Sequence, residues 1–423
     1  DHRDLHSFPT RRSSDLLRVK LYKPRLVYMQ RVYNNLWLFL LAAAVAYVLY
    51  AVAIGAMHTW PNAEAINECA LARWEGLWDY LKEMYFNRDG RYTTNFFHWF
   101  NPLTFGWVQG YQYMPFLGLL FFTGSVVFLF RTVFEGPLHA WLFTALFTAM
   151  HLALSPRISA EVFNMIGSFV YLYPLCFWML CAGCLVRCMQ APAPQASVWW
   201  YGWAVLFLVA MTGGVEISLV TGMVWLAALL LIGRQQCSLY RLWPLLLVFA
   251  AAAWLVVTNP GSRLEVNRNP GGLALFGWGQ LAGFYRAHLA QALHYQFTGS
   301  GALLWPMLAL AMLLPLRPQA QALFANGRRV LLWLVLPALA AAFLGSLPYY
   351  LFKAYGPAYH PRIFINPMFF VQGALVAMAL YAGTRLNLYR SARKPLLQLA
   401  AACWLLVALL VGDNKLNLLL DEY

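Results

Sequence analysis

Hydrophobic residues in this chain gather in long uncharged runs, and the segments between the runs hold almost all of the charged residues. A helix needs about 20 mostly apolar residues to cross a bilayer, because its backbone polar groups must be bonded within the helix. Eleven runs approach this length, at residues 35–57, 111–130, 137–154, 162–186, 198–212, 217–233, 242–258, 301–316, 330–347, 363–384 and 395–411. The pattern predicts an all-α polytopic membrane protein with about 11 transmembrane helices. Only the turn at Gly213 and Gly214 separates the fifth and sixth runs, which could instead form one broken helix or a re-entrant pair.

Composition supports the membrane interpretation and gives it an orientation. Hydrophobic residues make up 61% of the chain and charged residues 11%, which excludes a soluble domain. The net charge of +14 does not call for a nucleic-acid partner, since membrane proteins concentrate Lys and Arg in cytoplasmic loops. A cytoplasmic N-terminus places sixteen basic residues inside and eleven outside. We therefore expect a multi-pass membrane protein with its N-terminus in the cytoplasm, its C-terminus outside and the lipid bilayer as its surroundings.

The segments between the predicted spans define the domain organisation. Residues 1–16, DHRDLHSFPTRRSSDL, resemble the translated read-through of a sequencing adapter, so we expect them to be a non-native leader. Residues 17–423 then form a single transmembrane domain. Its extracytoplasmic loops are predicted at residues 58–110, 259–300 and 348–362, whereas the cytoplasmic segments are too short to hold a catalytic domain.

The first extracytoplasmic loop contains a helical pattern of its own. Apolar and aromatic residues recur at helical spacing with acids between them; one stripe comprises Trp74, Leu77, Trp78, Leu81 and Tyr85. This pattern predicts amphipathic helices that lie in the membrane interface with aromatic side chains at headgroup level. A platform for a sugar is the alternative for the same aromatic residues.

Charged residues distribute unevenly among the predicted outside segments. Residues 58–110 hold six acids and four basic residues, whereas the other outside segments up to residue 362 hold six basic residues and three acids. If the loops converge, a general acid or base would lie beside a phosphate-bearing substrate. Ordinary neutralisation of surface charge is the alternative.

Individual residues in these segments are candidates for substrate contacts. Glu161 and Glu216 lie at the mouths of hydrophobic spans, where a charge usually faces the bundle interior or a water-filled cavity. For Glu161, the alternative is an i, i+4 ion pair with Arg157 that has no role in function. For Glu216, the alternative is capping of the N-terminus of the sixth helix. Arg263, in the Pro-Gly turn after the seventh span, and Arg362, at the end of the third outside loop, could bind phosphate.

Histidine and cysteine give no metal or redox site by their spacing. Five histidines fall outside, at His58, His98, His288, His294 and His360, without H-x-x-x-H or an equivalent spacing. We expect His98 to be an interfacial side chain and Cys181 and Cys184 to be apolar residues of the fourth span. No Walker, G-x-S-x-G, H-E-x-x-H or dinucleotide motif is present. No cofactor is expected, with a divalent metal held by the outside acids as the alternative.

Four short motifs, in order, resemble those of an uncharacterised bacterial family within the GT-C class of polytopic glycosyltransferases. They are the acids Glu64 to Glu68, Gly90-Arg91-Tyr92, the YLYP segment at 171–174 with Glu216 beyond it, and Pro260-Gly261-Ser262-Arg263. The resemblance implies a location in the inner (cytoplasmic) membrane of a bacterium, a polyprenyl-phosphate-linked sugar as donor, and a carboxylate in the first outside loop that acts as base or holds a metal. An adjacent acid pair is typical of the class, whereas Glu64 and Glu68 here lie one helical turn apart.

The resemblance and the residues together give a working hypothesis. A sugar passes from polyprenyl phosphate to an extracytoplasmic cell-envelope glycan or lipid acceptor with inversion, and Glu64 or Glu68 acts as general base. Arg91 and Arg263 bind the lipid phosphate, and aromatics from Tyr92 onward line the cleft. The alternatives are a transporter or flippase of a lipid-linked or small anionic substrate, and an inactive scaffold homologue.

Overall fold

A computed structural model of the chain describes most of its helical bundle. The described residues are 13–155, 162–190, 194–236, 239–261, 279, 282–283, 285–287, 290, 303–345, 365–391 and 393–411. Within these ranges some side chains lie outside the description, among them those of residues 13–27 and 229–242 and that of Glu64.

The described residues are almost entirely helical. In the first half of the chain the elements are α1 (Ser13–Met57), α2 (Ala63–Glu83), η1 (Met84–Arg88), α3 (Tyr92–Trp99), η2 (Pro102–Phe105), η3 (Gln109–Tyr113), α4 (Met114–Phe130), α5 (Pro137–Leu154), α6 (Met165–Gly167), η5 (Ser168–Leu172), α7 (Tyr173–Gln190) and α8 (Pro194–Thr212). They continue as α9 (Glu216–Gln236), α10 (Leu239–Val257), α14 (Leu304–Leu313), α15 (Pro318–Phe324), α16 (Gly327–Val330), η7 (Leu331–Val335), α17 (Leu336–Leu344), α19 (Ile365–Arg385), η9 (Leu388–Arg390) and α20 (Lys394–Val411). An isolated bridge joins Phe134 to Leu316, and no strand occurs in the described part.

Each of the eleven predicted runs contains a helix, which confirms a helical membrane protein. Six described helical segments are long and apolar enough to cross a bilayer: Asn35–Met57, Gln109–Phe130, Pro137–Leu154, Met165–Gln190, Gly327–Leu344 and Ile365–Arg385. The number eleven itself stays a prediction. The turn at Gly213 and Gly214 separates two distinct helices, α8 and α9.

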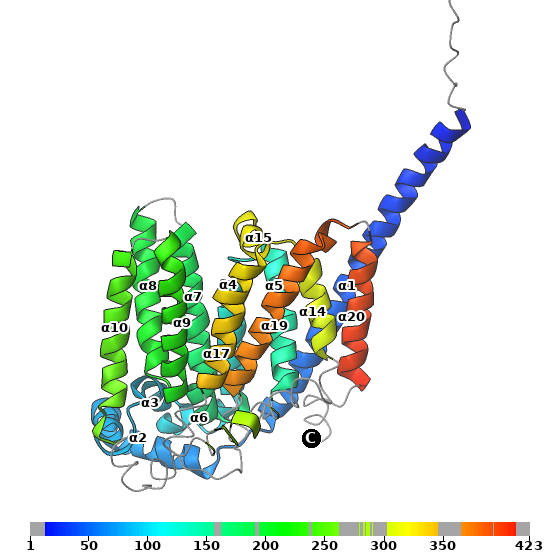
Figure 1. The fold of residues 1–423 in the computed structure, drawn as a ribbon. Coiled ribbons are helices and arrows are strands. Elements are labelled where there is room, and N and C mark those ends of the chain that lie inside the picture. Colours follow the sequence, from blue (N-terminus) through cyan, green and yellow to red (C-terminus); the bar gives the residue numbers. More distant parts are fainter. Residues whose placement is uncertain are drawn as a thin grey trace, which may run out of the picture.

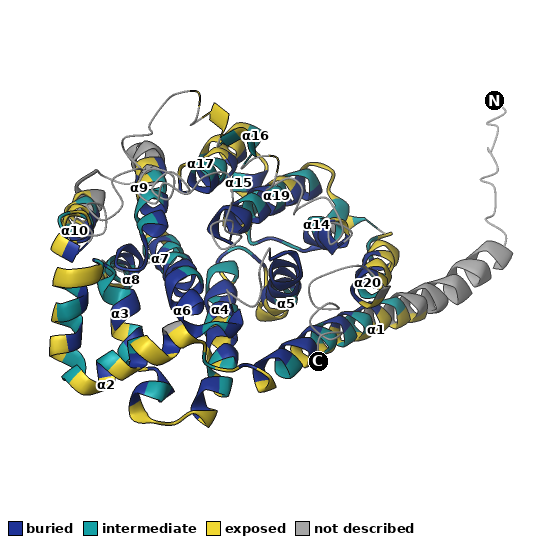
Figure 2. Ribbon diagram, turned by 90° about the horizontal axis from the view of Figure 1, so that it is seen from below, coloured by how far each residue is buried: buried dark blue, intermediate teal, exposed yellow. Residues whose placement is uncertain are grey.

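The long helices run side by side, and short elements cross the two ends of the bundle (Figure 1). One end carries α2, α3 and α6 and is called here the α2 end; α15 lies at the opposite end, called here the α15 end. Viewed onto the α2 end, α2 follows the outer edge while α3 lies inside it beside α8 (Figure 2). The first loop is therefore a folded layer over the bundle.

Aromatic side chains fill the centre of the bundle. Phe122, Phe147 and Phe369 surround the buried ring of His151, and both Phe122 and Phe147 stack on that ring. A ring nitrogen of His151 lies 2.9 Å from Gln372 Oε1, which ties α5 to α19 by a buried hydrogen bond. Where water is absent, such a bond replaces the hydration that both groups would lose.

The amphipathic helix predicted in the first loop is present as α2. Asn62 caps its first turn by accepting a hydrogen bond from the Ala65 backbone N–H at 2.8 Å, as expected of an N-cap asparagine. Gly76 interrupts the helix with a φ of 73°, a conformation that glycine adopts without the strain of a side chain. Trp74 and Trp78 are 87% and 73% exposed, as interfacial anchors require. Leu81 and Tyr85, farther along the predicted stripe, are half-buried instead.

Candidate functional site

The segment Asp89-Gly90-Arg91-Tyr92 joins the first-loop layer to the bundle. Asp89 is extended, with φ −143° and ψ 158°, and ends the π-helical turn η1, so that the chain reverses into α3. Gly90 fits closely: an added Cβ would lie 2.9 Å from Asn259 Cβ and 3.0 Å from the Val256 carbonyl oxygen. The reversal thus requires glycine at position 90 because the end of α10 leaves no room for a side chain.

Arg91 forms an ion pair with Glu216, the first residue of α9. Its Nη2 lies 3.2 Å from Glu216 Oε2, and its Nε lies 3.4 Å from Oε1. The Arg91 side chain is only 18% exposed. Burial alone would lower the pKa of Arg91, but the carboxylates of Glu216 and Asp89 outweigh it, so that the pKa is raised. The guanidinium is therefore permanently charged and already engaged by protein carboxylates.

Asp89 is held on one side by neighbouring donors. Its Oδ1 accepts hydrogen bonds from the Arg91 backbone N–H at 3.1 Å and from Asn95 Nδ2 at 2.9 Å. Its Oδ2 lies 3.8 Å from Arg91 Nη1, beyond ordinary hydrogen-bond distance. This arrangement fixes the carboxylate while leaving one oxygen able to accept a further proton donor.

The helix α3 docks on the turn between α8 and α9. The Thr93 backbone N–H donates to the Gly213 carbonyl at 3.0 Å, and Thr94 Oγ1 donates to the Gly214 carbonyl at 2.8 Å. The Tyr92 hydroxyl donates to the Val209 carbonyl at 2.8 Å, and its ring covers Gly213, where an added Cβ would clash with the ring. Burial raises the pKa of Tyr92 to about 12. Tyr92 is therefore a neutral anchor of the docked helix.

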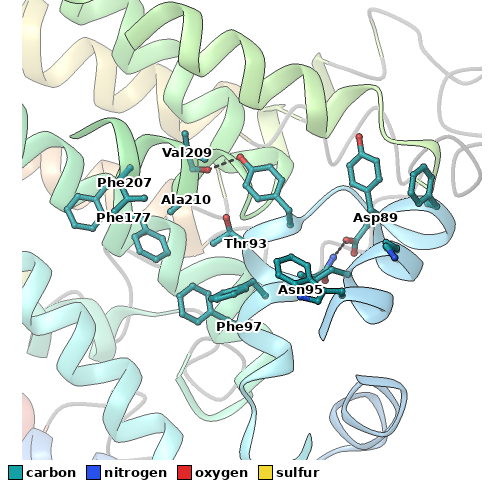
Figure 3. A pocket seen from close by; sticks show the side chains of 16 residues that line it. Asp89, Thr93, Asn95, Phe97, Phe177, Phe207, Val209 and Ala210 are labelled. Carbon is teal, nitrogen blue, oxygen red and sulfur yellow. Dashed lines mark hydrogen bonds between the residues drawn. The ribbon is translucent and has the colours of Figure 1, made fainter. Parts of the chain in front are cut away.

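A cavity of about 640 Å³ lies between this docked segment and the bundle. Its walls come from α2, η1, α3, α7 and α8; the lining residues are Trp78, Leu81, Lys82, Tyr85, Phe86, Asp89, Tyr92, Thr93, Asn95, Phe96, Phe97, Phe177, Leu206, Phe207, Val209 and Ala210. Asp89 and Asn95 lie at one end, and Phe177 and Phe207 lie toward the other (Figure 3). The volume falls within the range of about 300–1,000 Å³ typical of small-molecule sites. A mostly apolar cavity with a polar end suits an amphiphile.

The structure brings together several, but not all, of the residues predicted from the sequence. Arg91, Tyr92 and Glu216 meet, and Pro174 of the YLYP segment packs on Gly214, leaving no space there for a Cβ. The start of the Pro-Gly turn also contacts this region, since the Asn259 side-chain amide donates to the Tyr85 carbonyl. The loops therefore converge. The ion pair between Arg91 and Glu216, however, joins an arginine of the first loop to an acid of a later segment, whereas we expected acids of the first loop to face later basic residues.

Of the two acids predicted as general base, Glu68 has a described side chain, and it does not line the cavity. Glu68 pairs with Arg88 on the first-loop layer. Glu64 lies in α2, and its side chain is outside the described set. Glu161, Arg263 and Arg362 also lie outside the described residues, so their predicted roles stay predictions.

Sequence reasoning missed Asp89, Asn95 and Lys82 as cavity residues. The available signal was the position of Asp89 next to the Gly-Arg-Tyr motif, which places an acid at the same chain reversal as Arg91. The carboxylates do not fit a metal site, because those of Asp89 and Glu216 face a guanidinium or an amide. Among the described residues no three His, Cys, Asp or Glu side chains cluster as metal ligands would.

The prediction that His98 is an interfacial side chain is wrong. The side chain is 6% exposed, its ring lies 5.4 Å from that of Phe169, and neither ring nitrogen has a hydrogen-bond partner among the described residues. Burial lowers the pKa of His98 to about 4, and the charge of Asp89 only partly opposes this. His98 is therefore neutral in the fold at neutral pH.

This burial predicts a pH-dependent stability. The unfolded chain binds a proton at His98 below its ordinary pKa of about 6.5, whereas the fold resists protonation down to about pH 4. Stability is thus complete above pH 6.5 and falls by up to about 3 kcal/mol as the pH drops to 4. Thermal unfolding of detergent-solubilised protein between pH 7 and 4 measures this loss of stability. His98→Phe should flatten the profile, and the exposed His58→Phe should not; equal slopes in wild type and His98→Phe would contradict the assignment.

Comparisons with known proteins add no relative to this geometry: no family model, curated protein or solved structure matches the chain. The functional argument therefore rests on the residues of this chain.

Proposed function

We propose that the protein is an inverting membrane glycosyltransferase, which moves a sugar from a polyprenyl-phosphate donor to an extracytoplasmic acceptor of the cell envelope. One observation carries the proposal: a cavity with aromatic walls from α7 and α8 ends at a fixed carboxylate, Asp89. A lipid-linked sugar has the same polarity, with a long apolar chain and a polar head. The positive-inside rule supports an extracytoplasmic α2 end: Arg317, Arg328 and Arg329 flank α15 at the opposite end, and Arg131 and Arg187 interact electrostatically with that group.

The chemistry assigned to the polar end is general-base catalysis. An acceptor hydroxyl attacks the anomeric carbon of the donor, the new glycosidic bond forms, and the bond from that carbon to the phosphate oxygen breaks. The proton of the acceptor passes to Asp89 Oδ2, and the electron pair leaves with the polyprenyl phosphate. Lys82, which lines the same cavity, neutralises charge that develops on the phosphate.

This assignment changes the roles given to the first-loop acids and Arg91. Glu68 already faces Arg88, so Asp89 replaces it as the candidate base. Arg91 becomes a positioning residue for Asp89, because its guanidinium lies between the carboxylates of Asp89 and Glu216. Glu64 remains the alternative candidate base, Arg263 keeps its predicted role as a phosphate contact, and no step of the transfer is derived through a metal.

The test is a transfer assay on purified protein in proteoliposomes. Radiolabelled hexoses and pentoses on undecaprenyl phosphate serve as donors, and an extract of envelope glycans serves as acceptor. Ala210→Trp fills the cavity and should lower transfer at least about tenfold by excluding the donor. Val198→Trp adds the same indole to an exposed position of α8 and should leave transfer unchanged. No transfer by wild type from any donor, or equal rates in both variants, would reject the proposal.

Lipid translocation is the second candidate, and one observation favours it. A second cavity of about 610 Å³ shares the walls α7 and α8 with the first. Adjacent residues face different cavities: Phe177 lines the first and Trp178 the second. Movement of α7 and α8 could connect the two. Passage of a fluorescent undecaprenyl-phosphate sugar across proteoliposomes, without transfer to acceptor, would favour translocation over catalysis.

A further inference from the structure

The second cavity has an apolar floor at the centre of the bundle. Phe147, Trp178, Trp225, Phe369 and Phe370 form it. The Trp178 ring lies 5.0 Å from that of Trp225 and 5.2 Å from that of Phe370, which makes a continuous aromatic surface. Trp225 Nε1 is buried and has no hydrogen-bond partner among the described residues. Protein atoms therefore cover this nitrogen, and the part of the floor that faces the cavity is apolar.

Polar side chains line the same cavity at the α15 end. Gln190 ends α7, Gln319 lies in the first turn of α15, and Arg329 lies in α16. The Arg329 guanidinium lies 5.3 Å from the centroid of the Trp333 ring, and both residues line the cavity. The cavity therefore has the polarity of a lipid, with a cation and two amides at its outer end.

Electrostatics at this end favour an anion. Arg329 lies in the first turn of the helical segment that runs from Gly327 to Leu344, where the helix dipole disfavours a cation and attracts an anion. Arg187 stacks on Phe128 at 3.8 Å and on Trp200 at 4.8 Å. Arg131 and Arg317 lie near enough to interact with Arg187 electrostatically. Among the described residues the acid Glu135 lies at this end near Arg317, against several arginines, and the ion pairs described above all lie at the α2 end.

We propose that the second cavity is a binding site for one anionic phospholipid, with an acyl chain on the aromatic floor and the phosphate on Arg329. Arginine suits this role because its planar guanidinium can hold two phosphate oxygens. Gln190 and Gln319 can bond the hydroxyl groups of a glycerol headgroup. The bilayer supplies such lipids continuously, and a bound molecule packs between α7 and the η7–α19 side of the bundle.

The test measures how tightly different lipids bind the whole purified protein, by native mass spectrometry, and how far each lipid raises its unfolding temperature. The probes are phosphatidylglycerol, phosphatidylcholine with identical acyl chains, and undecaprenyl phosphate. Phosphatidylglycerol should bind at least about tenfold more tightly than phosphatidylcholine and should raise the unfolding temperature, since it binds only the folded state. Equal binding of the first two lipids would overturn the proposal. Tighter binding of undecaprenyl phosphate would overturn the commitment to a phospholipid and would instead support translocation.

Two matched pairs of variants locate the site. Arg329→Gln removes the cavity cation and should weaken phosphatidylglycerol about tenfold, whereas Arg328→Gln, a neighbour that does not line the cavity, should not. Gly373→Leu adds a side chain where open space surrounds the missing Cβ and should abolish binding by filling the cavity. Gly124→Leu, on α4, also meets open space but lies away from the cavity and should bind as wild type. Equal effects within either pair would contradict this location even if all variants fold.

Discussion

Asp89→Asn should lower sugar transfer roughly 100- to 10,000-fold, the usual contribution of a general base, while leaving the fold intact. The amide keeps the size of the carboxylate and can still accept from Asn95 Nδ2 and the Arg91 backbone N–H through its oxygen. It cannot take the proton of the acceptor hydroxyl. The loss should therefore appear in kcat, with little change in the KM of the donor, because binding along the aromatic wall is unaffected.

Glu83→Gln is the matched control for this prediction. Glu83 also lies in the first-loop layer, but it does not line the cavity, and its carboxylate accepts a hydrogen bond from Asn87 Nδ2 at 2.6 Å. Its substitution should leave kcat within about twofold of wild type, because the amide oxygen of glutamine can still accept from Asn87. A large loss in Glu83→Gln, or near-normal activity in Asp89→Asn, would remove Asp89 from the catalytic role and return attention to Glu64.

Arg91→Gln should destabilise the protein because it leaves the Asp89 and Glu216 carboxylates without their shared cation. Removal of one partner from a fully buried pair costs about 3–5 kcal/mol. Glu216 is 34% exposed, which screens its charge, so we expect about 2 kcal/mol. The thermal unfolding midpoint, followed by tryptophan fluorescence in detergent, measures the effect. Transfer should also fall, since Asp89 loses a neighbour that positions it.

The double variant Arg91→Gln with Glu216→Gln separates the ion pair from other contributions of Arg91. It removes the unpaired acid and should recover much of the lost stability, which a double-mutant cycle expresses as a coupling energy. Arg88→Gln breaks the pair with Glu68, whose arginine is 47% and whose glutamate is 16% exposed, and should cost about 1 kcal/mol, less than Arg91→Gln, because one carboxylate rather than two loses its cation. If the double variant is no more stable than Arg91→Gln alone, the pair does not hold the first-loop layer to the bundle.

The helices could be predicted from the sequence because the bilayer imposes a strong and simple rule on apolar runs. Each run contains a helix, and α2 was visible as a separate amphipathic pattern. The kink of α2 could not be predicted. Gly76 inside a helical pattern is compatible with an unbroken helix, and its φ of 73° depends on how the two parts of α2 lie on the bundle.

The candidate site was predicted only in part, because its contacts join residues far apart in the chain. Arg91 and Glu216 were both candidates, but their direct pairing depends on the docking of α3 at the Gly213-Gly214 turn. Asp89 entered the sequence analysis only as one of the six acids of the first loop, because its proposed role depends on the cavity beside it. His98 was misplaced because its aromatic surroundings come from the packing of η5, which the pattern around His98 does not encode.

The central claim is that a lipid-linked sugar occupies the cavity beside Asp89, and photochemical crosslinking tests it most directly. Purified protein in proteoliposomes would be irradiated with an undecaprenyl-phosphate hexose that carries a diazirine near its phosphate, and the modified peptides mapped by mass spectrometry. The account predicts adducts on α3 and on the cavity residues 78–86 of α2 and η1, where Lys82 lies, lost in Ala210→Trp and retained in Val198→Trp. Adducts confined to the second cavity, or spread evenly over the exposed helices, would contradict it.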